Sequence, residues 1–265
     1  MQQRIARALP ARHPWRDSIH YYDTIGSTND LALQMARTGA PAGTIVVAGS
    51  QTGGHGRMGR SFCSPAGMGV YLSCILRPQC PPEQLLHLTC GTAVAAMDAV
   101  ERAFGLRPGI KWTNDLVIGT QKLGGILTSL QIDPATGLAA SAIVGIGINC
   151  RQRREDFPPE LRETACSLAM HVPDAPPETL AAALIETLRE LDGLLLGGRA
   201  ALMARYRENC VTLGKAVSWQ AGDQLLHGTA ESLEEDGSLV LRLPDGTAQR
   251  VCFGEVSVRG MYGYL

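Results

Sequence analysis

The glycine-rich stretch Gly-His-Gly-Arg-Met-Gly-Arg-Ser at 54–61 constrains the fold more than any other segment. It satisfies the dinucleotide fingerprint G-x-G-x-x-G, and it nearly satisfies the phosphate-binding loop G-x-x-x-x-G-K-[ST], with Arg60 in place of the lysine. Both motifs require a helix directly after the glycines, because the helix N-terminus binds the phosphates. Here Pro65, Gly67 and Gly69 follow, which disfavours a helix and predicts a strand over 69–77. The sequence therefore excludes both nucleotide-binding folds in which a helix follows the glycines, and with them a plain oxidoreductase domain.

The composition of the chain argues against several classes of function. The chain has 265 residues, 45% of them hydrophobic and 18% charged, enough for a well-buried domain with a smaller one beside it. The net charge of −1 gives no electrostatic case for binding DNA or an anionic membrane. No apolar run approaches the roughly 20 residues that span a bilayer, and the N-terminus lacks a signal-peptide core. The eight cysteines show no metal-ligand spacing, so we expect a reduced, cytoplasmic protein without structural disulfides or zinc.

Local patterns predict an α+β fold. Ser27 and Asp30 form a capping box that opens a helix, and Gly39 closes it. Further helices are expected over 82–104 and 177–209, and strands over 44–50, 69–77, 110–112, 116–118, 124–132 and 141–149. Because the strands come in clusters joined by turns, we expect a mixed or antiparallel sheet flanked by helices, with the helices on one face.

The chain changes character after Leu213. Short strands follow one another, separated by Gly222-Asp223, Asp236-Gly237 and Asp245-Gly246. Asp-Gly between alternating apolar runs is a strong hairpin signal. We therefore predict a catalytic domain over 1–212 and a small β-barrel domain over 213–265.

The glycines of the 54–61 loop are interleaved with His55, Arg57 and Arg60. Glycines let the backbone approach a ligand, and two guanidinium groups suit a phosphate or a carboxylate. One interpretation is a mobile surface loop whose arginines are merely solvated. The other is a loop that an anionic ligand orders.

A second group of charged residues lies at 111–127, where Lys111, Asp115 and Lys122 interrupt an apolar strand-turn-strand segment. Lys122 precedes Gly124-Gly125, whose missing side chains leave room for a ligand against the sheet. The alternative is that both lysines protect an edge strand while Asp115 caps a turn.

Two more polar segments allow a ligand-binding and a purely structural interpretation. Asn149 ends an apolar strand, where it either contacts a ligand or forms a turn. Ser27 and Thr28 offer hydroxyl groups at an open helix N-terminus, where they bind a ligand or only cap the helix.

Taken together, these motifs resemble the biotin protein ligases in order and spacing. The matching segments are GSTN at 26–29, SQTGGHGRMGR at 50–60, KWTNDL and KLGGIL within 111–127, GIGIN at 145–149, FPPELRETACSL at 157–168 and GEVSVRG at 254–260. The resemblance implies a class II synthetase-like catalytic domain followed by an SH3-like C-terminal domain. About 20 residues precede the catalytic region, so the chain is similar to the monofunctional form without an N-terminal DNA-binding domain.

The resemblance also implies an activity. A ligase of this family activates biotin with ATP as biotinyl-5′-AMP and transfers it to a lysine of a biotin carboxyl carrier protein, for example that of acetyl-CoA carboxylase. Mg²⁺ is expected with ATP, without a dedicated protein metal site. The alternatives are a lipoate or octanoyl ligase or transferase on the same fold, and a biotin-dependent regulator, which the missing DNA-binding domain disfavours. Oligomeric state stays open, including a homodimer through an exposed sheet edge.

Motif position implies the role of each candidate residue. Lys122 contacts the biotin carboxylate and the α-phosphate, Arg57 holds the adenylate, and Asp115 orients Lys122 or acts on the incoming amine. The implied biotin-binding set is Ser27, Thr28, Asn29, Gln51, Gly54, His55, Gly56, Arg57 and Lys122. The implied nucleotide-binding set is Arg57, Arg60, Asn114, Lys122 and Asn149.

Two positions depart from the usual family pattern. His55 stands where the family usually has arginine, and we expect that position to act mainly through its backbone N–H. Phe62 stands where many relatives have tryptophan, and its ring should still cover a ligand.

Overall fold

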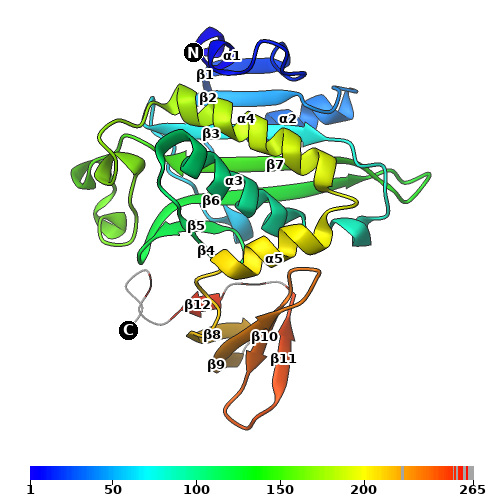
Figure 1. The fold of residues 1–265 in the computed structure, drawn as a ribbon, viewed down its shortest axis with the longest axis vertical. Coiled ribbons are helices and arrows are strands. Elements are labelled where there is room, and N and C mark those ends of the chain that lie inside the picture. The colour runs from blue at the N-terminus through cyan, green and yellow to red at the C-terminus, as the bar shows by residue number, and fades with distance from the viewer. Residues whose placement is uncertain (222–223, 253, 255, 259–260, 262–265) are drawn as a thin grey trace.

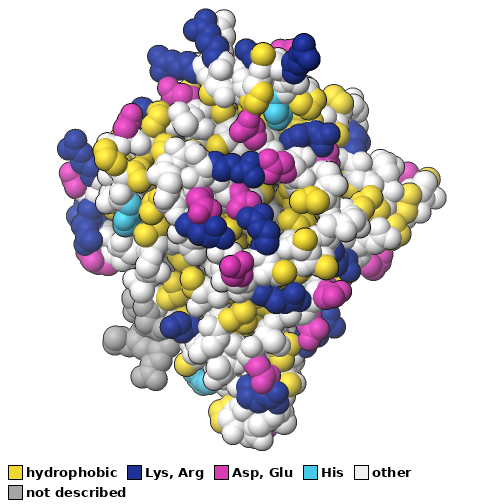
Figure 2. Space-filling view, viewed as in Figure 1, with side chains coloured by type: hydrophobic (Ala, Val, Ile, Leu, Met, Phe, Trp, Pro, Cys, Tyr) yellow, Lys and Arg dark blue, Asp and Glu magenta, His cyan; other side chains and the backbone are white. Residues whose placement is uncertain are grey.

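The computed structural model describes residues 1–221, 224–252, 254, 256–258 and 261. A large sheet crossed by helices forms the upper part of the molecule, and a smaller sheet lies beyond α5 (Arg199–Asn209), at one end of the larger unit (Figure 1). On the face shown in Figure 2, basic and acidic side chains are interspersed.

The larger sheet has seven strands in the order β1-β2-β3-β7-β6-β5-β4. Its strands are β1 (Ile19–Ile25), β2 (Ile45–Gln51), β3 (Gly69–Leu76), β4 (Gly109–Lys111), β5 (Asp115–Ile118), β6 (Gln121–Ile132) and β7 (Ala139–Asn149). Only the β1–β2 pair within this sheet is parallel, and the remaining neighbours pair antiparallel. The prediction of a mixed sheet is confirmed.

Helices cover both faces of this sheet, so the expectation of helices on one face is wrong. The helices are α1 (Gln2–Ala8), α2 (Thr28–Arg37), α3 (Leu88–Phe104), α4 (Pro177–Leu194) and α5. Ala32 and Ala36 of α2 pack against Val46, Ile75 and Ile143. The residues directly before and after these three along their strands point to the other face of the sheet, and their apolar side chains pack in the core with α3 and α4. Because strand side chains alternate between faces, strands that are apolar at successive positions bury both faces.

Both long predicted helices are interrupted. The first begins as a short 3₁₀ turn, Pro82–Leu85, and α3 starts only at Leu88. The second divides between α4 and α5 at Gly197-Gly198, where glycine lowers helix propensity. Gly105 ends α3 at φ 67°, as the sequence predicts.

The C-terminal part forms a five-stranded antiparallel sheet in the order β11-β10-β9-β8-β12. Its strands are β8 (Ala216–Ala221), β9 (Gln224–Leu233), β10 (Leu239–Arg242), β11 (Ala248–Val251) and β12 (Val256–Val258). Gly237 and Gly246 have φ of 87° and 85°, so the two Asp-Gly turns form as predicted. The predicted Gly222-Asp223 turn lies outside the described residues. The division into domains at 212 stays a prediction.

Within the part of the chain that the structure describes, no helix is long and apolar enough to cross a membrane.

Cysteine burial leads to a first testable prediction. All eight thiols are free, and only Cys63 and Cys252 are exposed. Burial raises the pKa of the thiols of Cys90, Cys150 and Cys166 to about 12. Because the thiolate is the reactive form, we expect a chromogenic aromatic disulfide to modify the two exposed thiols rapidly in the folded protein, and all eight in guanidinium chloride. Cys63→Ser should remove one rapid thiol, and rapid modification of a buried thiol would contradict this account.

Candidate active site

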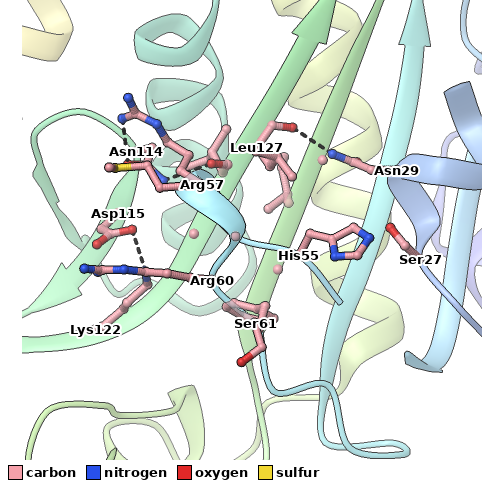
Figure 3. A pocket seen from close by; sticks show the side chains of 18 of the residues that line it. Ser27, Asn29, His55, Arg57, Arg60, Ser61, Asn114, Asp115, Lys122 and Leu127 are labelled. Carbon is pink, nitrogen blue, oxygen red and sulfur yellow. Dashed lines mark hydrogen bonds and ion pairs between the residues drawn. The ribbon is translucent and has the colours of Figure 1, made fainter. Parts of the chain in front are cut away.

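A pocket lies between the 54–61 loop, the N-terminus of α2 and the strands β4 to β7 (Figure 3). Alternate residues of β7 share one face of the sheet, so Gly145 and Gly147 face the same side as Ile143, which packs against α2. The pocket therefore opens on the α2 face. Its lining residues are Ser27, Thr28, Asn29, Gln51, His55, Gly56, Arg57, Met58, Arg60, Ser61, Phe62, Lys111, Trp112, Asn114, Asp115, Lys122, Gly125, Ile126, Leu127, Gly145, Ile146, Gly147, Gly254 and Val256.

Glycines on neighbouring strands form the floor of the pocket. Gly125 of β6 pairs with Gly147 of β7, and Gly145 is the next residue of β7 on the same face. A Cβ at Gly147 would lie 2.6 Å from the Phe62 ring, and one at Gly145 would lie 2.0 Å from Asn29 Oδ1. Only glycine lets Phe62 and the first turn of α2 approach the sheet this closely.

A buried polar network fixes the α2 end of the pocket. The backbone N–H of Thr28 donates to Gln51 Oε1 at 2.8 Å, and Asn29 Nδ2 donates to the carbonyl of Leu127 at 3.1 Å. Ser73 Oγ lies 2.8 Å from Thr28 Oγ1 and 2.5 Å from Asn29 Oδ1. Sequence reasoning missed Ser73, although a hydroxyl inside the fully buried strand β3 was a usable signal.

Charged side chains gather at the opposite end, over β4 to β6. Lys122 Nζ and Asp115 Oδ1 form an ion pair at 2.7 Å (Figure 3). A Cβ at Gly125 would lie 3.5 Å from Lys122 Nζ and 3.6 Å from Asp115 Oδ1, so the pair sits over this glycine. Lys111 lies directly opposite Asp115 in the β4–β5 register and is 4% exposed. The interpretation of both lysines as edge-strand protection is wrong, because β6 is an interior strand and Lys111 is buried.

Two contacts tie the 54–61 loop to the rest of the site. Arg57 Nη1 donates to Thr113 Oγ1 at 3.1 Å and to Asn114 Oδ1 at 3.3 Å. His55 Nε2 lies 2.9 Å from Asp30 Oδ2 at the start of α2. The loop therefore contacts both sides of the pocket, and Arg57 is not merely solvated.

Backbone bonds shape the same loop into a narrow hairpin. The N–H of Gly56 donates to the carbonyl of Arg60 at 2.6 Å, and that of Phe62 to the carbonyl of Gly54 at 2.9 Å. Met58 at the tip has φ 56° and is 73% exposed. A Cβ at Gly54 would lie 2.6 Å from the Phe62 carbonyl oxygen. Glycine at this position therefore allows the two arms of the loop to lie this close together.

The structure brings most predicted site residues together. The predicted catalytic, biotin-binding and nucleotide-binding residues that line the pocket are Ser27, Thr28, Asn29, Gln51, His55, Gly56, Arg57, Arg60, Asn114, Asp115 and Lys122. Gly54 and Asn149 lie outside the lining. Asn149 Nδ2 donates to the Cys166 carbonyl at 3.0 Å, and its Oδ1 accepts from Gln152 Nε2 at 3.1 Å, so its amide joins the end of β7 to the segments that follow.

Lining residues from the C-terminal sheet were not predicted. Gly254 and Val256 reach the pocket from the C-terminal part. Trp112 also connects the two parts, since its Nε1 donates to the carbonyl of Gly237 at 2.8 Å. No local pattern reports this contact, because it joins positions far apart in sequence.

No group of three or more His, Cys, Asp or Glu residues that could hold a metal ion occurs among the residues that the structure describes.

The anchoring of the loop generates a second testable prediction. Arg57→Ala removes two hydrogen bonds to the 112–114 turn, so we expect faster amide hydrogen exchange in peptides that cover 54–62. Arg37→Ala, at an exposed position of α2, is the matched control and should leave this exchange unchanged. Equal exchange in both variants would show that Arg57 does not anchor the loop.

Family comparisons agree with this geometry. Residues 21–149 match the biotin/lipoate A/B protein ligase family, and residues 212–259 match the biotin protein ligase C terminal domain. A biotin–[acetyl-CoA-carboxylase] ligase of Mycobacterium tuberculosis is 32% identical over 227 residues, which cover 82% of this chain and 80% of the relative. The chain belongs to the biotin protein ligase family.

Two further proteins place this member among its relatives. The bifunctional ligase/repressor BirA of Bacillus subtilis is 44% identical over 149 residues, which cover 56% of this chain. The chain spans about half the length of that relative, 45%. A solved biotin protein ligase from Aquifex aeolicus, in complex with biotin and ATP, superposes with a TM-score of 0.76 at 25% identity, covering 91% of this chain and 98% of the other.

Proposed function

We propose that this family member activates biotin with ATP as biotinyl-5′-AMP and transfers the biotinyl group to a lysine of a biotin carboxyl carrier protein. One observation carries the proposal. The pocket joins a cationic end, with Lys122, Arg57 and Arg60, to a neutral polar end at the N-terminus of α2. This arrangement suits a ligand with a neutral polar ring at one end and anionic groups at the other.

The cationic end fits the first step. The carboxylate of biotin attacks the α-phosphorus of ATP, a carboxylate–phosphate bond forms, and pyrophosphate leaves. Two anions approach each other, so fixed cations lower the barrier where negative charge builds. In this proposal Lys122 contacts the carboxylate and the α-phosphate, Arg57 holds the adenylate, and Arg60 and Asn114 contact the nucleotide.

The polar end fits the ureido ring of biotin, which needs both donors and acceptors. Ser27, Thr28 and Gln51 offer them, and Thr28 and Gln51 are already held in place by hydrogen bonds. Ligand-binding groups that are fixed in advance lose little entropy on binding. The glycines that form the floor of the pocket leave room for the ring and the valerate chain to lie close to the sheet.

In the second step the carrier lysine amine attacks the acyl carbon of the mixed anhydride, the carbonyl–phosphate bond breaks, and AMP leaves. Loss of the amine proton is required, and Asp115 is the carboxylate that lines the pocket. Orientation of Lys122 and action on the amine stay two open roles for Asp115.

The donor set is compatible with magnesium brought by ATP. Mg²⁺ prefers oxygen ligands and is commonly held by one or two carboxylates together with substrate phosphates. Asp115 would be the protein ligand, and the metal would neutralise phosphate charge. The predicted nucleotide contact of Asn149 has less support, because its amide is engaged elsewhere.

A lipoate or octanoyl ligase or transferase is the main alternative, since the larger family match covers both kinds of enzyme. The C-terminal match, which carries biotin ligases alone in its description, favours biotin. A biotin-dependent regulatory role stays the disfavoured second alternative. The absence of DNA binding and a cytoplasmic location stay predictions, and a homodimer stays open.

A transfer assay tests the proposal. The protein is incubated with labelled biotin, MgATP and a carrier domain, and label on the carrier lysine is measured. We expect transfer that Lys122→Ala lowers roughly 100- to 1,000-fold, because a fixed cation at a reacting anion contributes on this scale. Arg37→Ala is the matched control. A lack of transfer to the carrier, together with octanoyl or lipoyl transfer, would replace this assignment by the alternative.

His55 allows a narrower test. Its contact with Asp30 is exposed on both sides, so it contributes little to holding the loop. We expect His55→Arg, which restores the usual family residue, to change the release rate of biotinyl-5′-AMP by less than about tenfold. Single-turnover release measurements decide this, and a larger change would give the His55 side chain a specific role.

A further inference from the structure

Lys111 is a buried cation in the pocket for which the proposed reaction has no role so far. It lies on β4 directly opposite Asp115 of β5, and Asp115 in turn lies opposite Gly125 of β6. Side chains at directly opposed positions of an antiparallel pair share one face and lie close together. Lys111 and Lys122 therefore flank the same carboxylate, one from β4 and one from β6.

This arrangement poses a problem for the reaction. Lys122 is paired with Asp115, whose side chain is 14% exposed. To contact the biotin carboxylate, the Lys122 ammonium has to share its three N–H donors between Asp115 and the substrate, or to exchange one partner for the other. A largely buried carboxylate whose counter-ion moves away is destabilised. The exchange is unfavourable unless another cation stays with Asp115.

We propose that Lys111 is the positioning residue that keeps Asp115 compensated and thereby releases Lys122 for the anionic substrate. This inference rests on the proposed function, because it assumes that Lys122 binds the biotin carboxylate. In this role Lys111 acts through Asp115 and not on a reacting atom. It sets how much of the binding free energy of Lys122 is available to the substrate rather than to Asp115.

Burial and position separate this role from ordinary packing. A lysine on an edge strand normally extends into water, where it discourages strand pairing. Lys111 is on the edge strand β4 but is 4% exposed and lines the pocket. Burying an ammonium group is costly unless it is paired, so its position opposite Asp115 has an energetic reason.

The test compares biotin with biotinamide, its neutral amide analogue, by isothermal titration calorimetry. The ratio of the two dissociation constants reports the contact to the carboxylate alone. We expect the unaltered protein to prefer biotin, Lys122→Met to lose this preference, and Lys111→Met to lower it at least about tenfold. Lys111→Arg keeps the charge and should stay within about threefold of the unaltered protein.

Asp115→Asn provides a second variant that does not depend on the folding of a Lys111 variant. Without the carboxylate there is no charge to leave behind, so the preference for biotin should be retained or increased. In that background Lys111→Met should change the preference by less than about threefold.

Several results would overturn the inference. In one, Lys111→Met weakens biotin and biotinamide by the same factor, as a purely structural role predicts. In another, its effect persists unchanged beside Asp115→Asn, or Asp115→Asn alone lowers the preference tenfold. If the unaltered protein does not distinguish the two ligands, the proposed function fails at Lys122, and the inference falls with it.

Discussion

The absence of side chains at Gly145 and Gly147 is the constraint on which the site depends. These positions lie on a central strand with neighbours on both sides, where most residues would place a side chain against α2 or the loop. Phe62 and Asn29 occupy that space instead, each closer to the sheet than a Cβ would allow. A sheet face built from Gly125, Gly145 and Gly147 leaves a flat surface, and the polar network and the charged groups lie around its margin. Elsewhere the same sheet is covered by ordinary apolar packing.

The local sequence was sufficient to predict features that depend on near neighbours. The Ser27 cap, the strand after the glycine-rich loop and the Asp-Gly turns all follow from chemistry within a few residues. Lys122 and Asp115 were also identifiable, because charged residues in an apolar segment require a reason. These predictions rest on one segment at a time.

Features that depend on pairing between distant segments were not predictable in this way. The sequence gives no register between β3 and β7, so it does not reveal that Ser73 lies beside Asn29 rather than in the opposite core. Burial of Lys111 depends likewise on the assembly of β4 against β5 and on the residues above it. The position of α2 on the second face was missed because a helical pattern reports that one face is apolar, not which surface it covers. Asn149 is the opposite case. The sequence made it a plausible ligand-binding residue, but its amide donates to the carbonyl of Cys166 in the structure.

The 112–114 turn between β4 and β5 links the separate parts of the site. The loop reaches this turn through Arg57, and the hydroxyl of Tyr206 in α5 donates to the carbonyl of Thr113 at 3.0 Å. The C-terminal sheet reaches it through the Trp112–Gly237 hydrogen bond, and Lys111 and Asp115 flank it in the two strands. A displacement of the C-terminal sheet would therefore act on residues 112–114, which bind Arg57 of the loop and separate Lys111 from Asp115. Because a buried tryptophan N–H without its acceptor is costly, the docked C-terminal sheet helps to hold the turn in position. The small sheet is thus part of the structure that keeps the cations in place.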